Sequence, residues 1–275
     1  MTNKDFGGVG IIAGQGLLPK IVYDECLKKG IRSKLIGLKG EINENFFQDI
    51  KYDQFKPYEI GRIFNYLEEN NLTKIIIAGR VNRSNLSKLI FDKIGVKIFA
   101  EIVKTGFNDN NIYSAIIKVI EGRGFKIISP NEIIEDILVQ KGNVTDILID
   151  EELDADIRKG VDILKGIIGY DIGQALIIDN GLVLGVEAAE GTNELINRCT
   201  KYKNRNRNNS GVLIKLCKPH QDKRVDLPCI GPDTIKNIAK NAYKGIVVEA
   251  KKSIILASKD TIRLANENKI FIYGV

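Results

Sequence analysis

The residues best suited to chemistry lie together in a loop at positions 218–235, with the sequence KPHQDKRVDLPCIGPDTI. Two carboxylates, Asp222 and Asp226, alternate there with cations that include Lys218 and Arg224. Prolines and a glycine interrupt any regular element, and a helical pattern follows at once. Cations bind phosphate, carboxylates bind Mg²⁺ or activate water, and a helix N-terminus favours anions. The loop therefore has the composition of a site for a phosphorylated, metal-bound substrate.

Asp226 is the strongest candidate for the catalytic carboxylate in this loop. The Leu-Pro pair that follows it holds its backbone extended. Three cations close in the sequence, Lys215, Lys218 and Arg224, are suited to neutralising phosphate. The alternative is that Asp226 forms a structural ion pair with Arg224.

His220 is the only histidine of the chain and lies in the same loop. A single histidine excludes histidine-rich zinc sites and the two-histidine arrangement of calcineurin-like metallophosphoesterases. No serine lies in a GxSxG turn, so a Ser-His-Asp hydrolase is not supported. We expect His220 to be an ordinary loop residue without a catalytic role.

A second candidate is the turn Gly14-Gln15-Gly16, which follows a predicted strand and precedes a predicted helix. Backbone N–H groups in such a turn can hold a phosphate. The dinucleotide fingerprint GxGxxG fails, because Pro19 occupies the position of its third glycine. A dinucleotide-dependent dehydrogenase is therefore disfavoured. A nucleotide or phosphate role stands beside the alternative of a tight turn that binds nothing.

Arg80, Val81 and Asn82 follow the third predicted strand. Ligands of open parallel sheets bind at the carboxyl edge of the strands, so these residues are suited to gripping a diphosphate or a nucleoside. The alternative is that their charges pair with neighbouring helices.

Four polar residues bracket a predicted hairpin in the second half of the chain, namely Gln174, Glu187, Glu190 and Thr192. Glu187 would be partly desolvated at the end of an apolar strand, and the clustering of these residues in one short unit indicates function. The alternative is that residues 190–192 merely begin a helix with Thr192 as its cap.

The elements that position these residues alternate between strands and helices in the first half of the chain. The runs 9–13, 34–38, 74–78 and 125–128 are apolar on both faces, which is typical of a parallel sheet covered by helices. We therefore predict an α/β fold with an N-terminal Rossmann-like parallel-sheet domain at residues 1–134.

The second half of the chain is predicted to have a different architecture from the first. Asp179-Asn-Gly181 between two apolar runs is typical of a hairpin, and hairpins pair antiparallel. Residues 135–148 are less regular and are predicted to link the domains. We predict a C-terminal α+β catalytic domain with antiparallel strands at residues 149–275.

The amino-acid composition of the chain restricts the kinds of partner that it is expected to bind. The net charge of +6 suits anionic partners, and the basic run 201–207 is predicted to be an exposed loop and not a nucleic-acid patch. The four cysteines form no CxxC pair and are expected to be free thiols. No apolar run approaches the roughly 20 residues that span a bilayer, and no secretory signal opens the sequence. We expect a cytoplasmic protein, peripheral at the inner-membrane surface and homodimeric, that binds no nucleic acid.

With these residues in view, the chain resembles the UDP-2,3-diacylglucosamine pyrophosphatases of the type unrelated to calcineurin-like metallophosphoesterases, which act in lipid A biosynthesis in Gram-negative bacteria. The resemblance covers nearly the whole chain and rests on the order and spacing of several motifs. They are GIIAGQG at 10–16, AGRVNR at 78–83, DIGQ at 171–174, GVEAAEGT at 185–192, the loop from residue 218 to 231, and GIVVEA at 245–250.

The resemblance implies hydrolysis of UDP-2,3-diacylglucosamine to UMP and 2,3-diacylglucosamine 1-phosphate (lipid X), with Mg²⁺. By motif, the essential aspartate of the family falls on Asp226. The substrate site of the family would be lined by Gln174, Glu190, Thr192 and Lys215. We expect Asp226, with Glu187 or Glu190, to hold the metal, and Lys215, Lys218 and Arg224 to balance charge on the phosphates.

Two alternatives come from other classes of protein. One is a regulatory protein that binds a nucleotide sugar without catalysis. The other is a nucleic-acid-binding protein, which only the net charge and the 201–207 run support.

Overall fold

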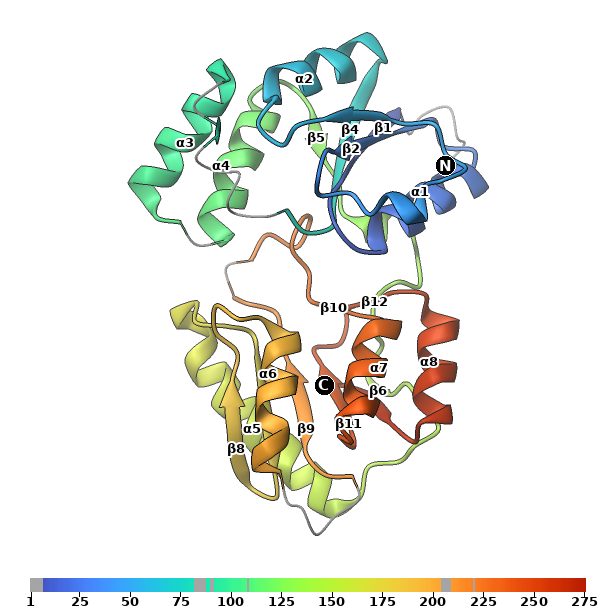
Figure 1. The fold of residues 1–275 in the computed structure, drawn as a ribbon, viewed down its shortest axis with the longest axis vertical. Coiled ribbons are helices and arrows are strands. Elements are labelled where there is room, and N and C mark those ends of the chain that lie inside the picture. Colours follow the sequence, from blue (N-terminus) through green and yellow to red (C-terminus); the bar gives the residue numbers. More distant parts are fainter. Residues whose placement is uncertain (1–6, 82–87, 90–91, 108, 204–208, 220) are drawn as a thin grey trace. The chain divides into compact units, whose positions relative to one another are not determined.

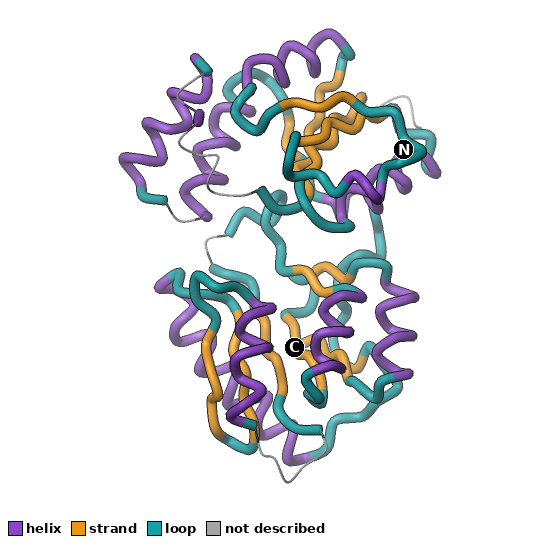
Figure 2. The backbone as a smooth tube through the Cα atoms, in the orientation of Figure 1, coloured by secondary structure: helices purple, strands orange, loops and turns teal. Residues whose placement is uncertain are grey.

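The computed structural model of the chain describes residues 7–81, 88–89, 92–107, 109–203, 209–219 and 221–275. It divides into two compact units, drawn in Figure 1 and Figure 2. Unit 1 comprises Met1–Glu135 together with Asp222–Asp226, and unit 2 comprises Asp136–Gln221 together with Leu227–Val275. The segment that carries Asp226 therefore belongs to the N-terminal unit, although it lies in the second half of the sequence.

Unit 1 is built on a parallel sheet whose described strands run in the order β3-β2-β1-β4-β5. This order is that of a doubly wound sheet, whose ligands bind beyond the carboxyl ends of the strands. The elements are β1 (Gly8–Ala13), α1 (Leu18–Lys28), β2 (Ser33–Leu38), β3 (Asp53–Phe55), α2 (Ile60–Glu69), β4 (Leu72–Ala78), α3 (Lys93–Thr105), α4 (Asp109–Glu121) and β5 (Lys126–Ile127). The predicted α/β class is confirmed.

The two faces of this sheet pack against different helices, because successive side chains of a strand point to opposite faces. Val9 and Ile11 of β1 share a buried cluster with Val22 of α1. On the other face, Ile36 of β2 lies in a cluster with Phe64 of α2 and with α4, and Ile12 packs against that cluster. The central strands are thus covered on both sides and must end in loops at the sheet edge.

Unit 2 contains a mixed sheet whose described strands run in the order β6-β13-β11-β9-β7-β8. Strands β9, β11 and β13 are parallel, whereas β7, β8 and β6 pair antiparallel at the flanks. The elements are β6 (Gly142–Asn143), α5 (Glu151–Ile167), β7 (Ala175–Asp179), β8 (Leu182–Val186), α6 (Thr192–Cys199), β9 (Val212–Lys215), β10 (Cys229–Ile230), α7 (Pro232–Lys240), β11 (Gly245–Val248), β12 (Ile254–Ile255), α8 (Ser258–Glu267) and β13 (Phe271–Gly274).

Helices cover both faces of this sheet as well. Leu164 of α5 shares a buried cluster with Ile214 of β9, whereas Leu213 of the same strand faces a cluster with α6, α7 and α8. Figure 1 shows α6, α7 and α8 on the near side of the sheet. The antiparallel strands predicted for this half are present, but they flank a parallel core that the hairpin signal could not reveal.

Two elements of unit 2 lie next to the predicted hairpin and the predicted loop. Helix α6 begins at Thr192, because the turn at residues 187–191 carries the chain from β8 into α6. Strand β12 pairs with β10 in a separate two-stranded sheet. The hairpin is confirmed, with Asn180 and Gly181 both at positive φ, as a type I′ turn requires.

None of the helices that the structure describes combines the length and the apolar character needed to span a membrane.

Candidate active site

The loops after β1 and β4 are joined by backbone hydrogen bonds at the carboxyl edge of the unit 1 sheet. Gly14 N donates to Ala78 O at 2.8 Å, Gln15 N donates to Arg80 O at 2.8 Å, and Arg80 N donates to Gln15 O at 3.1 Å. A Cβ atom on Gly14 would lie 2.3 Å from Arg80 O, so only glycine permits this approach. The amides of Gly14 and Gln15 are thus bound to carbonyls, which disfavours a phosphate cradle made of these two groups.

Side chains extend the polar character of this edge. Gln15 Nε2 donates to Glu41 Oε2 at 3.0 Å, and Glu41 is buried just beyond the end of β2. Arg80 and Val81 are exposed at the surface. Asn82, which was predicted to belong to this group, lies outside the described residues. Loops after three neighbouring strands therefore place an amide, a carboxylate and a guanidinium at one edge.

The segment Asp222–Asp226 is attached to unit 1 by three kinds of contact. Arg224 Nη1 lies 2.5 Å from Glu121 Oε1 at the end of α4. Ser129 Oγ donates to the backbone oxygen of Lys223 at 3.3 Å. Val225 packs against the apolar cluster beneath α2 and α4. An ion pair, a hydrogen bond and an apolar contact therefore hold the segment to the unit.

Asp222 and Arg224 brace this segment internally. Arg224 Nε donates to Asp222 Oδ1 at 3.0 Å and Nη2 donates to Oδ2 at 2.7 Å, which is a bidentate pair. These hydrogen bonds hold the pKa of the Asp222 carboxyl below its ordinary value and raise the pKa of Arg224. Asp226 N donates to Asp222 O at 3.1 Å, closing one turn. The Asp222–Arg224 pair thus fixes the backbone that presents Asp226. Arg224, which the alternative pairs with Asp226, forms ion pairs with Asp222 and Glu121.

In unit 2, a buried chain of polar side chains lies at the carboxyl end of β9. Lys215 Nζ donates to Thr192 Oγ1 at 3.1 Å, and Thr192 Oγ1 donates to Glu187 Oε1 at 2.6 Å. Gln174 N donates to the other Glu187 oxygen, Oε2, at 2.9 Å. Lys215, Thr192 and Glu187 are only 5%, 8% and 5% exposed. The structure therefore brings four of the predicted residues together, with a buried ammonium at the centre.

Lys218 and Glu190 lie in more exposed ion pairs of the same unit. Lys218 Nζ lies 2.6 Å from Asp171 Oδ1, and the Asp171 backbone is left-handed, with φ at 57°. Glu190 accepts hydrogen bonds from Arg198 Nε at 3.1 Å and Nη2 at 2.9 Å. Hydrogen bonds, first from backbone and then from Arg198, hold the Glu190 pKa below its ordinary value. Glu190 is therefore paired with Arg198.

Comparison with known proteins shows the family to which this chain belongs. The model for the LpxI N-terminal domain matches residues 8–137, and the model for the LpxI C-terminal domain matches residues 140–273. The chain belongs to the LpxI family. It is also 31% identical over 242 residues to a Caulobacter vibrioides protein named UDP-2,3-diacylglucosamine pyrophosphatase LpxI, and the match covers 84% of each chain.

The two LpxI domains differ from the two structural units at one place. The C-terminal family domain includes residues 222–226, whereas these residues pack with unit 1. Asp226 therefore belongs to unit 1 and Lys215 to unit 2.

Two carboxylates of this LpxI chain were missed by sequence reasoning. Asp171 pairs with Lys218, and Glu249 Oε2 accepts a hydrogen bond from Cys217 N at 3.1 Å. Glu249 directly follows β11, the parallel neighbour of β9, so its place at the end of an apolar run was the available signal. It anchors the start of the loop that leads to Asp222.

The carboxylates of the site differ in how well they could serve as metal ligands. Within the part of the chain that the structure describes, no three His, Cys, Asp or Glu side chains converge as a metal cage. Mg²⁺ rarely uses such a cage, because one or two carboxylates, water and substrate phosphates complete its shell. Both Glu187 oxygens accept hydrogen bonds. A single half-buried carboxylate such as that of Asp226 would suit Mg²⁺ that a diphosphate carries.

Replacing Arg224 with alanine is expected to loosen the segment that carries Asp226. Because the ion pairs are partly exposed, the expected loss is about 1 kcal/mol, seen as about fivefold faster amide hydrogen exchange in residues 222–226. The control is Arg263→Ala, which removes a guanidinium that also lies between two carboxylates, Asp260 and Glu267, on α8. Equal protection of the segment in Arg224→Ala and the unmodified protein would contradict an anchoring role.

The same anchor has a defined pH dependence. The folded pKa of Asp222 is depressed, so its stabilisation of the segment is complete above the ordinary value of 3.8 and disappears as pH falls through the lower folded pKa. As that stabilisation is lost at low pH, amide hydrogen exchange in residues 222–226 should accelerate. Asp222→Asn should abolish this acceleration.

Proposed function

We propose that this chain is a UDP-2,3-diacylglucosamine pyrophosphatase of lipid A biosynthesis. Water would cleave the P–O–P bridge and release UMP and 2,3-diacylglucosamine 1-phosphate, known as lipid X. The observation that carries the proposal is the relative of that name, which is 31% identical over 84% of both chains. The buried Lys215–Thr192–Glu187 chain and the braced Asp226 supply groups of the kind that phosphoryl transfer needs.

The residues would act in separate roles. Asp226 would orient water and hold Mg²⁺, which supplies charge neutralisation on the phosphoryl oxygens. Lys215 and Lys218 would stabilise negative charge that develops on the diphosphate. Glu187 and Thr192 would hold the Lys215 ammonium in place, since Thr192 connects the two charges. Glu190, paired with Arg198, would line the site at its more exposed side.

The test is direct measurement of UMP release from UDP-2,3-diacylglucosamine with Mg²⁺ and with EDTA. We expect turnover with Mg²⁺ and its loss with EDTA. The alternative of a regulatory nucleotide-sugar-binding protein predicts saturable substrate binding without UMP under either condition. That result would overturn the proposal.

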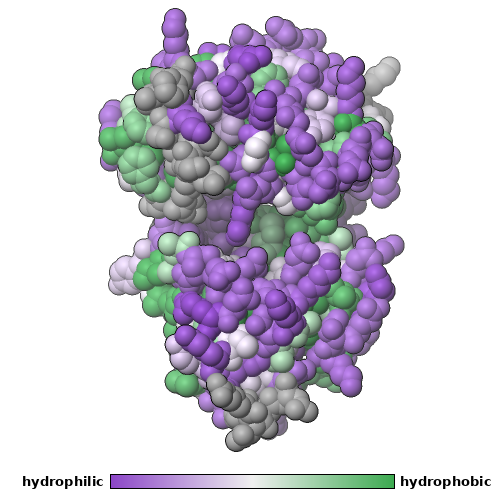
Figure 3. Space-filling model, in the orientation of Figure 1, coloured by the Kyte–Doolittle hydropathy of each residue, from purple (hydrophilic) through white to green (hydrophobic). Residues whose placement is uncertain are grey.

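We also propose that the protein works in the cytoplasm, peripherally at a membrane, because its substrate carries acyl chains. Helix α3 exposes Val96 and Val103, at 46% and 55%, and Phe107, the second residue after its end, is 53% exposed. Lys93, Lys97 and Lys104 are exposed on the same helix. Figure 3 shows hydrophobic side chains at the edge of unit 1 over this helix. Apolar side chains flanked by lysines suit the surface of an anionic bilayer.

The paired change Val96→Asp and Val103→Asp is expected to abolish flotation with phosphatidylglycerol vesicles, because it places two charges on the apolar surface. Turnover of detergent-dispersed substrate should be preserved. The matched control is Leu182→Asp, at a side chain that is 64% exposed in unit 2. Unchanged flotation of the α3 variant would refute this contact surface. The expected homodimer remains a prediction, and sedimentation would test it.

A further inference from the structure

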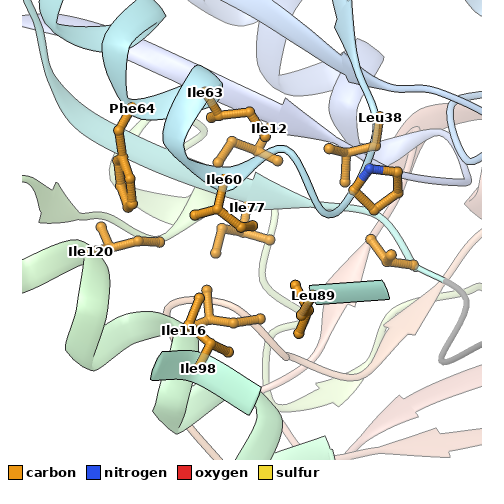
Figure 4. Close-up of a pocket in the computed structure, with 12 residues that line it drawn as sticks. Ile12, Leu38, Ile60, Ile63, Phe64, Ile77, Leu89, Ile98, Ile116 and Ile120 are labelled. Carbon is orange, nitrogen blue, oxygen red and sulfur yellow. The ribbon is translucent and has the colours of Figure 1, made fainter. Parts of the chain in front are cut away.

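Unit 1 contains an apolar cavity on the sheet face that α2 and α4 cover. It is lined by 12 residues, whose side chains Figure 4 shows. The cavity has a volume of about 120 Å³. Strands contribute Ile12, Leu38 and Ile77, and helices contribute Ile60, Ile98 and Ile116. Every one of these described lining residues is aliphatic, aromatic or proline.

The chemistry of this cavity points to a hydrocarbon ligand. Protein interiors are normally packed as densely as organic crystals, yet Ile12, Ile60, Ile77 and Ile116 are only half-buried around this space. Ligand pockets usually contain a few polar groups that orient the ligand. A pocket with an entirely apolar lining selects the part of a ligand that has no polar groups. An acyl chain has this property, and a uridine or a sugar does not.

The position of the cavity connects it to the polar residues of the same unit. Ile12 and Ile77 precede the ends of β1 and β4, so the cavity lies at the carboxyl edge of the sheet. Val81 lines it and directly follows Arg80, whose backbone pairs with Gln15. A ligand with its headgroup at this polar edge can therefore place its tail in the cavity.

The cavity also lies close to the catalytic segment. Ile12, Ile60, Ile77, Ile116 and Val225 all pack against the same buried cluster. Val225 is the residue before Asp226 and belongs to unit 1. Asp226 therefore directly follows Val225, whose side chain packs against the same buried cluster as four of the residues that line the cavity.

We propose that this cavity binds an acyl chain of the diacylglucosamine moiety of the substrate. The inference rests on the proposed function, because the substrate class supplies the hydrocarbon. Each methylene buried in apolar surroundings strengthens binding about fourfold. The cavity would thus make affinity depend on chain length, while Asp226 and the cations of the site act on the diphosphate.

The binding test uses the absence of tryptophan from the chain. A tryptophan introduced by Val81→Trp reports on the mouth, and one introduced by Ile116→Trp reports on the wall. The probe is 2,3-diacylglucosamine 1-phosphate with brominated acyl chains, which quenches fluorescence on contact. We expect saturable quenching in both variants and none in Leu182→Trp, whose site lies on unit 2. Calorimetric binding of the probe without quenching at either cavity position would overturn the proposal.

The kinetic test compares UDP-diacylglucosamine substrates with short and long acyl chains. Ile60→Phe fills the cavity, and it is expected to lower kcat/KM by about tenfold or more for the long-chain substrate, a loss comparable to removing two buried methylenes. The value for the short-chain substrate should stay within about twofold, which the same methylene scale assigns to less than one methylene. Thermal unfolding checks that the variant is folded.

The outcomes separate the two proposals. An equal loss of kcat/KM for both substrates would overturn the cavity as the acyl site while leaving the proposed function intact. If the probe quenches the Val81→Trp and Ile116→Trp variants but the unmodified protein releases no UMP from either substrate, the proposed reaction is wrong although the cavity binds acyl chains. Quenching by brominated free fatty acid but not by the brominated diacylglucosamine phosphate would overturn the assignment to the substrate.

Discussion

Replacement of Asp226 by alanine is expected to lower kcat by about 10²–10³-fold, or roughly 2.7–4 kcal/mol, without loss of the fold or of substrate binding. Asp226 is half-buried at the end of a turn that Asp222 and Arg224 brace. Its backbone contacts do not need the carboxylate, so the turn should survive the change. UMP release measures kcat, and calorimetry measures substrate affinity.

The matched control is Asp233→Ala, which removes a carboxylate a few residues further along the chain. The Asp233 side chain is 99% exposed at the start of α7, so turnover should stay close to that of the unmodified protein. Near-normal turnover by Asp226→Ala would exclude Asp226 as the catalytic carboxylate.

Replacement of Lys215 by methionine is expected to damage both turnover and stability. The lost cation should lower kcat/KM by about 10²–10³-fold, because charge on the diphosphate is no longer stabilised. Glu187 would remain buried without its counter-charge, which typically costs about 3–5 kcal/mol of unfolding free energy. UMP release and denaturant unfolding measure the two effects.

Two further variants separate the catalytic effect from the structural one. Adding Glu187→Gln to Lys215→Met removes the uncompensated charge, so stability should recover while turnover stays low. Lys203→Met removes another lysine with low exposure, which donates to the backbone oxygens of Asn241 and Ala242 and whose pKa burial lowers to about 8. It should lose stability but keep turnover. Recovery of turnover in the double variant would rule out a direct catalytic role for Lys215.

The sequence predicted those parts of the fold that local apolar patterns determine. Residues 75–78 are an uninterrupted apolar run, and they lie in the interior strand β4. Strand β3, Asp53–Phe55, has two exposed polar residues and gave no such pattern. The parallel core of unit 2 was not predicted either, because the direction in which β9 and β11 pair depends on the helix between them and not on either strand.

The candidate site was predictable as a set of residues but not as a geometry. The sequence indicated Lys215, Glu187 and Thr192, yet their connection joins positions 215, 192 and 187, which no local spacing reveals. Asp171 was missed because its partner, Lys218, lies on a distant loop. The alternation of Asp222 and Arg224 with other charges predicted a site for phosphate and metal, whereas these two side chains brace the turn.

The composition of unit 1 has a consequence for how such a protein can be encoded. Because Asp222–Asp226 completes a unit made otherwise of Met1–Glu135, a gene divided between the two family domains would place the aspartate on one product and Glu121 and Ser129 on the other. Gene fission and domain shuffling, which readily separate self-contained modules, would leave Arg224 without its partner on α4 in either product. The two halves are therefore expected to be inherited as one reading frame.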